Sequence, residues 1–285
     1  MQIAQMKRNK SFIVEKEDLR KINVSNADLS LSRKQFEAFL VGQHSAGKIM
    51  YFNQPELDEY VVLHPPALVN ILKSFITDEM FWPKLSRFET IKTMVFRNHR
   101  ENVLKAHIRK ILKDMNKTGR IFRLDLQKIW AQKSVQIETV EIGEFVIKLL
   151  VHLDVLIVPR LYRDIGKDAS DNSSSLLVPC VIKEKLPMSF FEEESFRERT
   201  IALVFTLKRS AIPSGLAYKL IGAVSSIWPL KEEDGKTLLF QFAAVFSVNS
   251  EHEMIIFVQE NEVITYLTYN TSTSQIAADV AASIQ

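Results

Sequence analysis

Residues 42–49, GQHSAGKI, match seven of the eight positions of the phosphate-binding signature GxxxxGK[S/T]. In that signature, the backbone N–H groups of the loop and the lysine bind the phosphates, and the final hydroxyl binds Mg²⁺. The final residue here is Ile49, which offers no oxygen to a metal. Gly42, Gly47 and Lys48 can therefore serve a nucleotide only if the elements around them fit.

The elements expected around this loop have the wrong order for phosphate binding. A strand must enter such a loop and a helix must leave it, so that the helix N-terminus faces the anion. Residues 32–45 instead have the pattern of an amphipathic helix, with Phe36, Phe39 and Leu40 on its apolar side, and Gly47 is expected to end it in a left-handed conformation. A strand is expected next, in KIMYF. We interpret Gly42, Gly47 and Lys48 as a decoy of a phosphate loop.

Other residue types that could do chemistry are scattered. Cys180 is the only cysteine, which excludes a disulfide framework and favours a buried, inert thiol in a reducing cytosol. The acidic run 192–194 is typical of a solvated linker. No two histidines have the i, i+4 spacing of a helical zinc site; they are His44, His64, His99, His107, His152 and His252. We expect no enzymatic activity, no cofactor and no metal, although a site assembled from distant residues stays open.

Positive charge is concentrated in one part of the chain. Residues 97–133 contain eleven Lys or Arg and three acidic residues, a local charge of +8, against +3 for the whole chain. A helix expected at 98–117 carries a basic row beside its apolar stripe: Lys105, Arg109, Lys113 and Lys117. We interpret this row as a candidate partner surface, either a solvated face or a protein contact. An acidic partner, a lipid surface and nucleic acid are the alternatives, although nucleic acid is not expected.

Helices and strands follow one another in an order typical of a mixed α+β protein. Residues 1–188 alternate short helices and strands, with a helix at 141–152, strands in DVLIVPRL and SLLVPCVI, and a flexible loop at 163–175. Residues 196–285 predict a smaller α+β subdomain of order β-α-β-β-β-α, with TLLFQFAAVFSV as one strand and a closing helix in TSTSQIAADVAASI. No secretory signal is expected, because no apolar run follows the basic residues near the N-terminus. No membrane span is expected, because residues 211–230 contain prolines and an amphipathic helix pattern. We expect a cytoplasmic location.

Four segments occur in a distinctive order: GKIMYFNQPELDEYVVLHPPALVNIL, GRIFRLDLQKIW, LLVPCVIKEKLP and AIPSGLAYKLI. Together they resemble the COR region, the C-terminal partner of the Roc GTPase domain in Roco proteins, a group that includes leucine-rich-repeat kinases and death-associated protein kinase. The first segment departs from the family at His64, where Asp is usual, and at Ala67, where Trp is usual. The residues that fit the family pattern are Gly47, Tyr51, Phe52, Leu57, Val62, Leu63, Pro65, Leu68, Pro213, Gly215, Lys219 and Leu220.

The resemblance implies winged-helix-like units in residues 1–188 and a COR-B-like α+β subdomain in residues 196–285. It also implies a non-catalytic role in dimerisation and in relaying the state of a Roc-type GTPase, or of another signalling domain, in cis or in trans. The chain would then be a fragment of a longer protein or a relative without Roc. A winged-helix nucleic-acid-binding protein using residues 97–133 is the alternative.

A self-contact is hypothesised in residues 196–285. The motivation is TLLFQFAAVFSV, which is apolar on both faces and must be covered. Either a second copy of the chain or the core of the subdomain can cover it.

Overall fold

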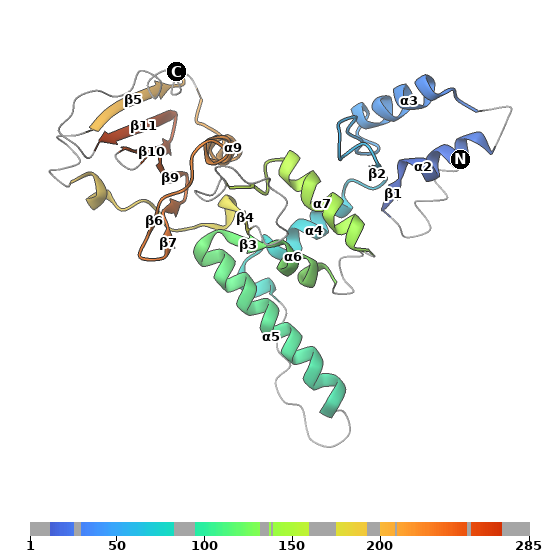
Figure 1. Ribbon diagram of the computed structural model, residues 1–285, viewed down its shortest axis with the longest axis horizontal. Helices are drawn as coiled ribbons and strands as arrows, with labels where there is room; N and C mark the ends of the chain where they lie inside the picture. The colour runs from blue at the N-terminus through green and yellow to red at the C-terminus, as the bar shows by residue number, and fades with distance from the viewer. Residues whose placement is uncertain are drawn as a thin grey trace. The chain divides into compact units, whose positions relative to one another are not determined.

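The computed structural model describes residues 12–25, 30–82, 95–131, 137, 139–159, 175–192, 200–208, 210–249 and 252–269. These residues form both helices and sheets, so the chain has a mixed α+β fold, as predicted (Figure 1). The chain divides into two compact units. The first consists of Met1–Leu112 and Arg123–Leu153, and the second of Lys113–Phe122 and Asp154–Gln285. The predicted subdomain boundary between 188 and 196 stays a prediction. The described helices include none that is long and apolar enough to cross a membrane.

The first unit begins with a small sheet and two helices. A capping box at Ser32 starts α3, and Gly47, at φ +67°, follows its end in the expected left-handed conformation. The strand expected in KIMYF is wrong: Met50 makes only an isolated bridge to Val62. The elements are β1 (Ile13–Glu15), α2 (Lys16–Val24), α3 (Arg33–Ser45) and β2 (Tyr60–Val62), with β1 antiparallel to β2.

The rest of the first unit is helical. Trp130, fully buried, donates a hydrogen bond from its indole Nε1 to the Ser74 hydroxyl at 3.1 Å, which joins α6 to α4. α6 also contacts α7. The helices predicted at 98–117 and 141–152 are confirmed, as α5 and α7 respectively. The elements are α4 (Ala67–Phe75), η2 (Glu79–Phe81), α5 (Val95–Thr118), α6 (Arg123–Trp130) and α7 (Val140–His152), and α5 extends beyond Leu112 into the second unit.

The second unit begins with short pieces of extended chain. The strand expected in SLLVPCVI is shorter than predicted, because Pro179 has no N–H for the ladder and begins a 3₁₀ turn. The strand expected in DVLIVPRL is reduced, in its described part, to a bridge from Ile157 to Leu177. The elements are β3 (Arg120–Phe122), antiparallel to β4 (Ser175–Leu177), then η4 (Pro179–Val181) and η5 (Met188–Phe191).

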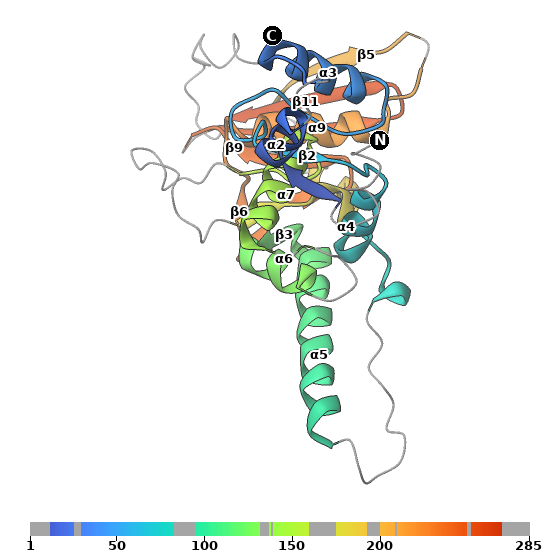
Figure 2. The same ribbon diagram turned by 90° about the vertical axis from the view of Figure 1, so that its right-hand side faces the viewer.

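A five-stranded antiparallel sheet dominates the second unit, with the order β5-β11-β10-β9-β8. Figure 2 shows β5 at the margin of this sheet, beyond β11. The elements are β5 (Thr200–Thr206), α9 (Ser214–Ser225), β6 (Glu232–Glu233), β7 (Lys236–Thr237), β8 (Leu239–Phe240), β9 (Ala243–Ser247), β10 (His252–Gln259) and β11 (Glu262–Tyr269).

The prediction of one strand in TLLFQFAAVFSV is wrong. β8 and β9 form a hairpin whose bend places Phe242 at φ +60°. Two tertiary contacts hold this bend: the Phe242 carbonyl accepts from the Val258 N–H at 2.9 Å, and its ring lies 5.3 Å from the ring of Tyr218. Neither contact is local in sequence, so the segment itself gives no turn signal.

The core covers both faces of this hairpin. Leu239, Ala244 and Phe246 belong to a cluster that includes residues of α9, and Phe240 and Val245 belong to a second cluster on the other face. Burial in the core is therefore the alternative that holds for TLLFQFAAVFSV, and its apolar residues are not exposed for a self-contact. The predicted closing helix lies outside the described residues, and so does the predicted loop at 163–175 except for Ser175, which begins β4.

Candidate functional site

The residues of the phosphate-loop match lie where a helix ends. Gly42 is inside α3, three residues before its last residue, Ser45. Gly47 and the exposed Lys48 follow, and the chain then continues into the bridge at Met50. The local order is thus helix, loop and extended chain, which confirms the predicted helix and loop but not the predicted strand, and no helix N-terminus follows Lys48 directly to face an anion.

The basic row on α5 has one member held by other side chains. The Arg109 guanidinium pairs with Glu79 at 3.1 Å and lies over the Trp82 ring at 5.7 Å. Lys113 and Lys117 are exposed, and Lys105 is half-buried. The apolar stripe predicted on the same helix consists of Leu104, Ile108, Ile111, Leu112 and Met115. Ile108, Leu112 and Met115 are buried and Ile111 is half-buried, but the prediction is wrong for Leu104, which is 44% exposed.

No side-chain cluster with the chemistry of a metal centre occurs in the described part of the chain, where no three His, Cys, Asp or Glu residues are grouped to hold an ion. Cys180 is a free, half-buried thiol. Burial raises the pKa of this thiol, which reduces its reactive thiolate fraction at neutral pH.

A polar cluster in the first unit was not foreseen from the sequence. The Tyr51 hydroxyl donates to Glu37 at 2.6 Å and accepts from Lys16 at 3.3 Å, and Lys16 also pairs with Asp58 at 3.4 Å. Burial and the bond to Glu37 raise the pKa of Tyr51 to about 12, so its hydroxyl stays a donor at neutral pH. Tyr51 is only 2% exposed, which suits a structural tie between α3 and the following loop.

The edge strand β5 is the most unusual surface of the second unit. Its sequence, TIALVFT, has no charge and no proline, and the large apolar side chains along it are exposed on both faces of the strand. Native edge strands usually carry charges, prolines or bulges that prevent pairing with another chain. Of these large side chains, Ile201 is 43% exposed, Leu203 37%, Val204 52% and Phe205 50%.

One side of β5 is used and the other is open. The Leu207 N–H donates to the Asn261 carbonyl at 2.8 Å, so the odd-numbered residues before it direct their backbone groups toward β11. Residues 200, 202, 204 and 206 therefore direct theirs outward, where no described strand pairs with them.

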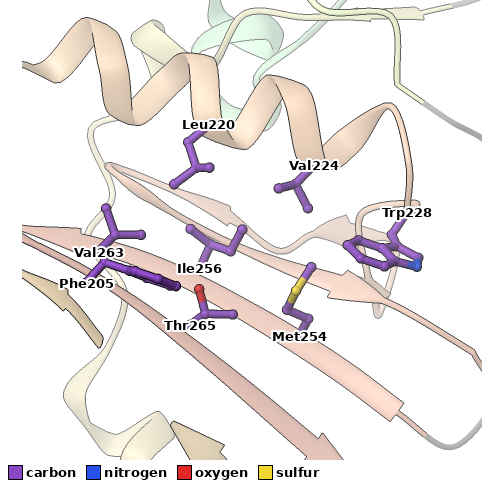
Figure 3. Close-up of a pocket in the computed structure, with 8 residues that line it drawn as sticks. All are labelled: Phe205, Leu220, Val224, Trp228, Met254, Ile256, Val263 and Thr265. Atoms are coloured by element: carbon purple, nitrogen blue, oxygen red, sulfur yellow. The ribbon is translucent and has the colours of Figure 1, made fainter. Parts of the chain in front are cut away.

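An apolar groove lies between α9 and the sheet. Its volume is about 340 Å³. In Figure 3, Leu220 and Val224 point from the helix toward the strands, while Ile256 and Thr265 point up from the sheet and Phe205 of β5 lies at one end. Thr265 brings the only hydroxyl, and the lining contains no charged group, so the groove suits apolar side chains rather than a polar substrate.

Sequence reasoning predicted β5 as a strand but not as an open edge, because the edge depends on pairing with β11, more than fifty residues away. Compared with protein-family models and with curated proteins, the chain matches none of them.

Proposed function

We propose that this chain is a non-catalytic, COR-type dimerisation and signal-relay region that acts beside a Roc-type GTPase or another signalling domain in the cytoplasm. Residues 1–188 would be its winged-helix-like part and residues 196–285 its COR-B-like part. The mechanism is mechanical: two copies associate through a paired surface, and a shift at that surface reports on the attached domain.

The observation that carries this proposal is the open edge of β5. β5 consists of seven uncharged residues. Four of them, residues 200, 202, 204 and 206, direct their backbone N–H and C=O groups outward. A second copy can satisfy these groups by antiparallel pairing of β5 with β5, which is a self-complementary contact with two-fold symmetry. Two five-stranded sheets would then join into one.

Exposed apolar side chains strengthen the case for pairing. Val204 lies on one face of β5, and Leu203 and Phe205 lie on the other, so a second β5 would find cross-strand partners on both faces. No charge along Thr200–Thr206 opposes the approach of an identical strand.

Nucleic-acid binding through α5 has no specific observation in its favour. The Arg109 side chain, in the middle of the basic row, pairs with Glu79 and lies over Trp82. A row of basic side chains that binds nucleic acid would direct its guanidinium groups to the phosphates instead.

The test is the absolute mass by light scattering after size exclusion, over a tenfold range of concentration. We expect twice 32.8 kDa at the upper end. Val204→Pro removes an outward N–H while the odd-numbered ladder to β11 remains, and Val204→Lys adds a charge at the same place; both should give monomers. Val204→Thr, which keeps the N–H and the strand propensity, is the matched control and should remain dimeric.

Two results would contradict the proposal. A wild-type mass of 32.8 kDa at every concentration removes self-association itself. A dimer that survives both Val204→Pro and Val204→Lys places the contact away from β5. Circular dichroism of each variant establishes that the sheet is retained.

A further inference from the structure

A short turn in the first unit displays two large apolar side chains to solvent. Met80 and Phe81 of η2 are 72% and 69% exposed, the two highest exposures among the large apolar residues that the structure describes. The residues on either side of them are anchored. Glu79 pairs with the Arg109 guanidinium at 3.1 Å, and the buried Trp82 donates from its indole Nε1 to a backbone carbonyl five residues earlier at 3.2 Å. The turn therefore holds its apolar tip in water, and an exposed apolar patch rimmed by polar groups marks a protein or membrane contact.

α5 lies beside this turn and is strongly basic. The Arg109 guanidinium, which pairs with Glu79, also lies 5.7 Å from the centre of the Trp82 ring, so η2 is held against the middle of the helix. α5 contains seven Lys or Arg and two acidic residues. Lys110, next to Arg109, is exposed. Even with Asp78 and Glu79 counted, η2 and α5 together keep a net positive charge.

We propose that η2 and α5 form an interfacial contact for a membrane with anionic lipid headgroups. Met80 and Phe81 enter the boundary between the headgroups and the acyl chains, while Lys110 and the other basic residues of α5 attract the phosphates. Inserting apolar side chains and basic groups together are the pattern of a peripheral membrane contact. This contact goes beyond the proposed relay role and shares no residue with β5.

The kind of side chain favours lipid over a protein partner. Met80 and Phe81 project into solvent, so a protein partner would need a pocket shaped for them, whereas the acyl boundary of a bilayer accepts any shape. Lysine is a compact charge on a flexible stem, which suits headgroups that move. Arg109 has the planar fork that suits fixed, bidentate recognition, and it is already paired with Glu79.

The test is co-sedimentation of the full chain with vesicles, either of phosphatidylcholine alone or of phosphatidylcholine mixed with phosphatidylserine. We expect binding to the mixed vesicles and little binding to phosphatidylcholine alone. Raising the salt from about 0.1 M to about 1 M shortens the Debye length from about 10 Å to about 3 Å, so binding to the mixed vesicles should fall.

Substitutions separate the apolar contribution from the electrostatic one. Met80→Ser combined with Phe81→Ser removes the inserting groups and should lower the partition coefficient to the mixed vesicles about tenfold or more. Lys110→Gln should lower it about fivefold. The matched controls are Val24→Ser, at a 65% exposed apolar position of α2, and Lys34→Gln, at an exposed position of α3. Both should bind like the wild type, and circular dichroism establishes that each variant is folded.

Insertion has a readout of its own. Phe81→Trp places an indole at the tip of the turn, and its fluorescence should shift to shorter wavelength when the mixed vesicles are added. An unchanged emission shows that the tip stays in water and overturns the proposal.

Three results of the binding assay also overturn it. They are no sedimentation with the mixed vesicles at low salt, equal binding to both kinds of vesicle, and an unchanged partition coefficient for Met80→Ser with Phe81→Ser. Retention on duplex DNA or heparin without vesicle binding gives the basic helix to a soluble polyanion instead. The mass measured by light scattering does not depend on any of these results, so the self-contact through β5 stands or fails separately.

Discussion

Among the glycines that the structure describes, Gly119 is the one where a single added methyl group should cost most. It lies between α5 and β3 at φ +69°, and a Cβ built there would be 2.8 Å from Cδ2 of Leu239 and 3.2 Å from two side-chain carbons of Ile182. Gly119→Ala therefore adds two penalties. A left-handed conformation costs an L-residue about 1–2 kcal/mol. Overpacking a filled core costs about 1–3 kcal/mol.

The expected total for Gly119→Ala is about 2–5 kcal/mol, the sum of these two penalties. Leu239 is only 3% exposed, so it cannot turn away without displacing its own neighbours. Gly235→Ala is the matched control in the same unit: its φ is +73°, but a Cβ there meets nothing within 4 Å. The control should therefore lose only about 1–2 kcal/mol.

Urea unfolding, followed by circular dichroism and by tryptophan fluorescence, measures both variants. The two probes are needed because the chain has two compact units, which can unfold separately. If Gly119→Ala and Gly235→Ala lose the same free energy of unfolding, packing around Gly119 adds nothing and the reasoning is refuted.

Three further predictions concern the first unit. The pKa of Tyr51 is about 12 in the folded protein, against an ordinary value of 10.0. The stability that its neutral hydroxyl contributes should therefore be full below pH 10 and be lost between about pH 10 and 12. Absorbance titration shows the late ionisation, and Tyr51→Phe removes it. Ser74→Ala leaves the buried indole N–H of Trp130 without its partner and should cost about 1–3 kcal/mol, measured by urea unfolding against Ser45→Ala. Ser32→Ala removes the capping box of α3 and should cost about 1 kcal/mol in the same assay.

Local signals made α3 and its end predictable. The spacing of Phe36, Phe39 and Leu40 indicated the buried side; Phe36 and Leu40 are buried, whereas Phe39 is 36% exposed. Gly47 is left-handed, as a glycine after a helix tends to be. These signals need only neighbours in sequence, so reading the residues was sufficient. The same reasoning gave the order of elements around the phosphate-loop match.

Tertiary contacts decided the features that sequence reasoning missed. The bend at Phe242 contains no glycine, proline or asparagine, and its conformation is held by the N–H of Val258 and the ring of Tyr218. The openness of β5 depends in the same way on which strand pairs with its other side. A pattern of apolar residues indicates burial in general, but it does not tell which edge of a sheet is left unpaired.

The place of β5 in the sheet also has a consequence for the order in which the unit assembles. β9, β10 and β11 are consecutive in sequence and pair as neighbours, so their contacts have low contact order. β5 pairs with β11 across 56 to 68 residues, so its loop closes late and at a larger entropic cost. The amides of β5 that face β11 should accordingly exchange with solvent before those of β10, through partial openings in which the three-stranded meander persists. The same openings would release β5 to another chain, which makes the outermost strand both the last part to fold and the first part available for exchange between molecules.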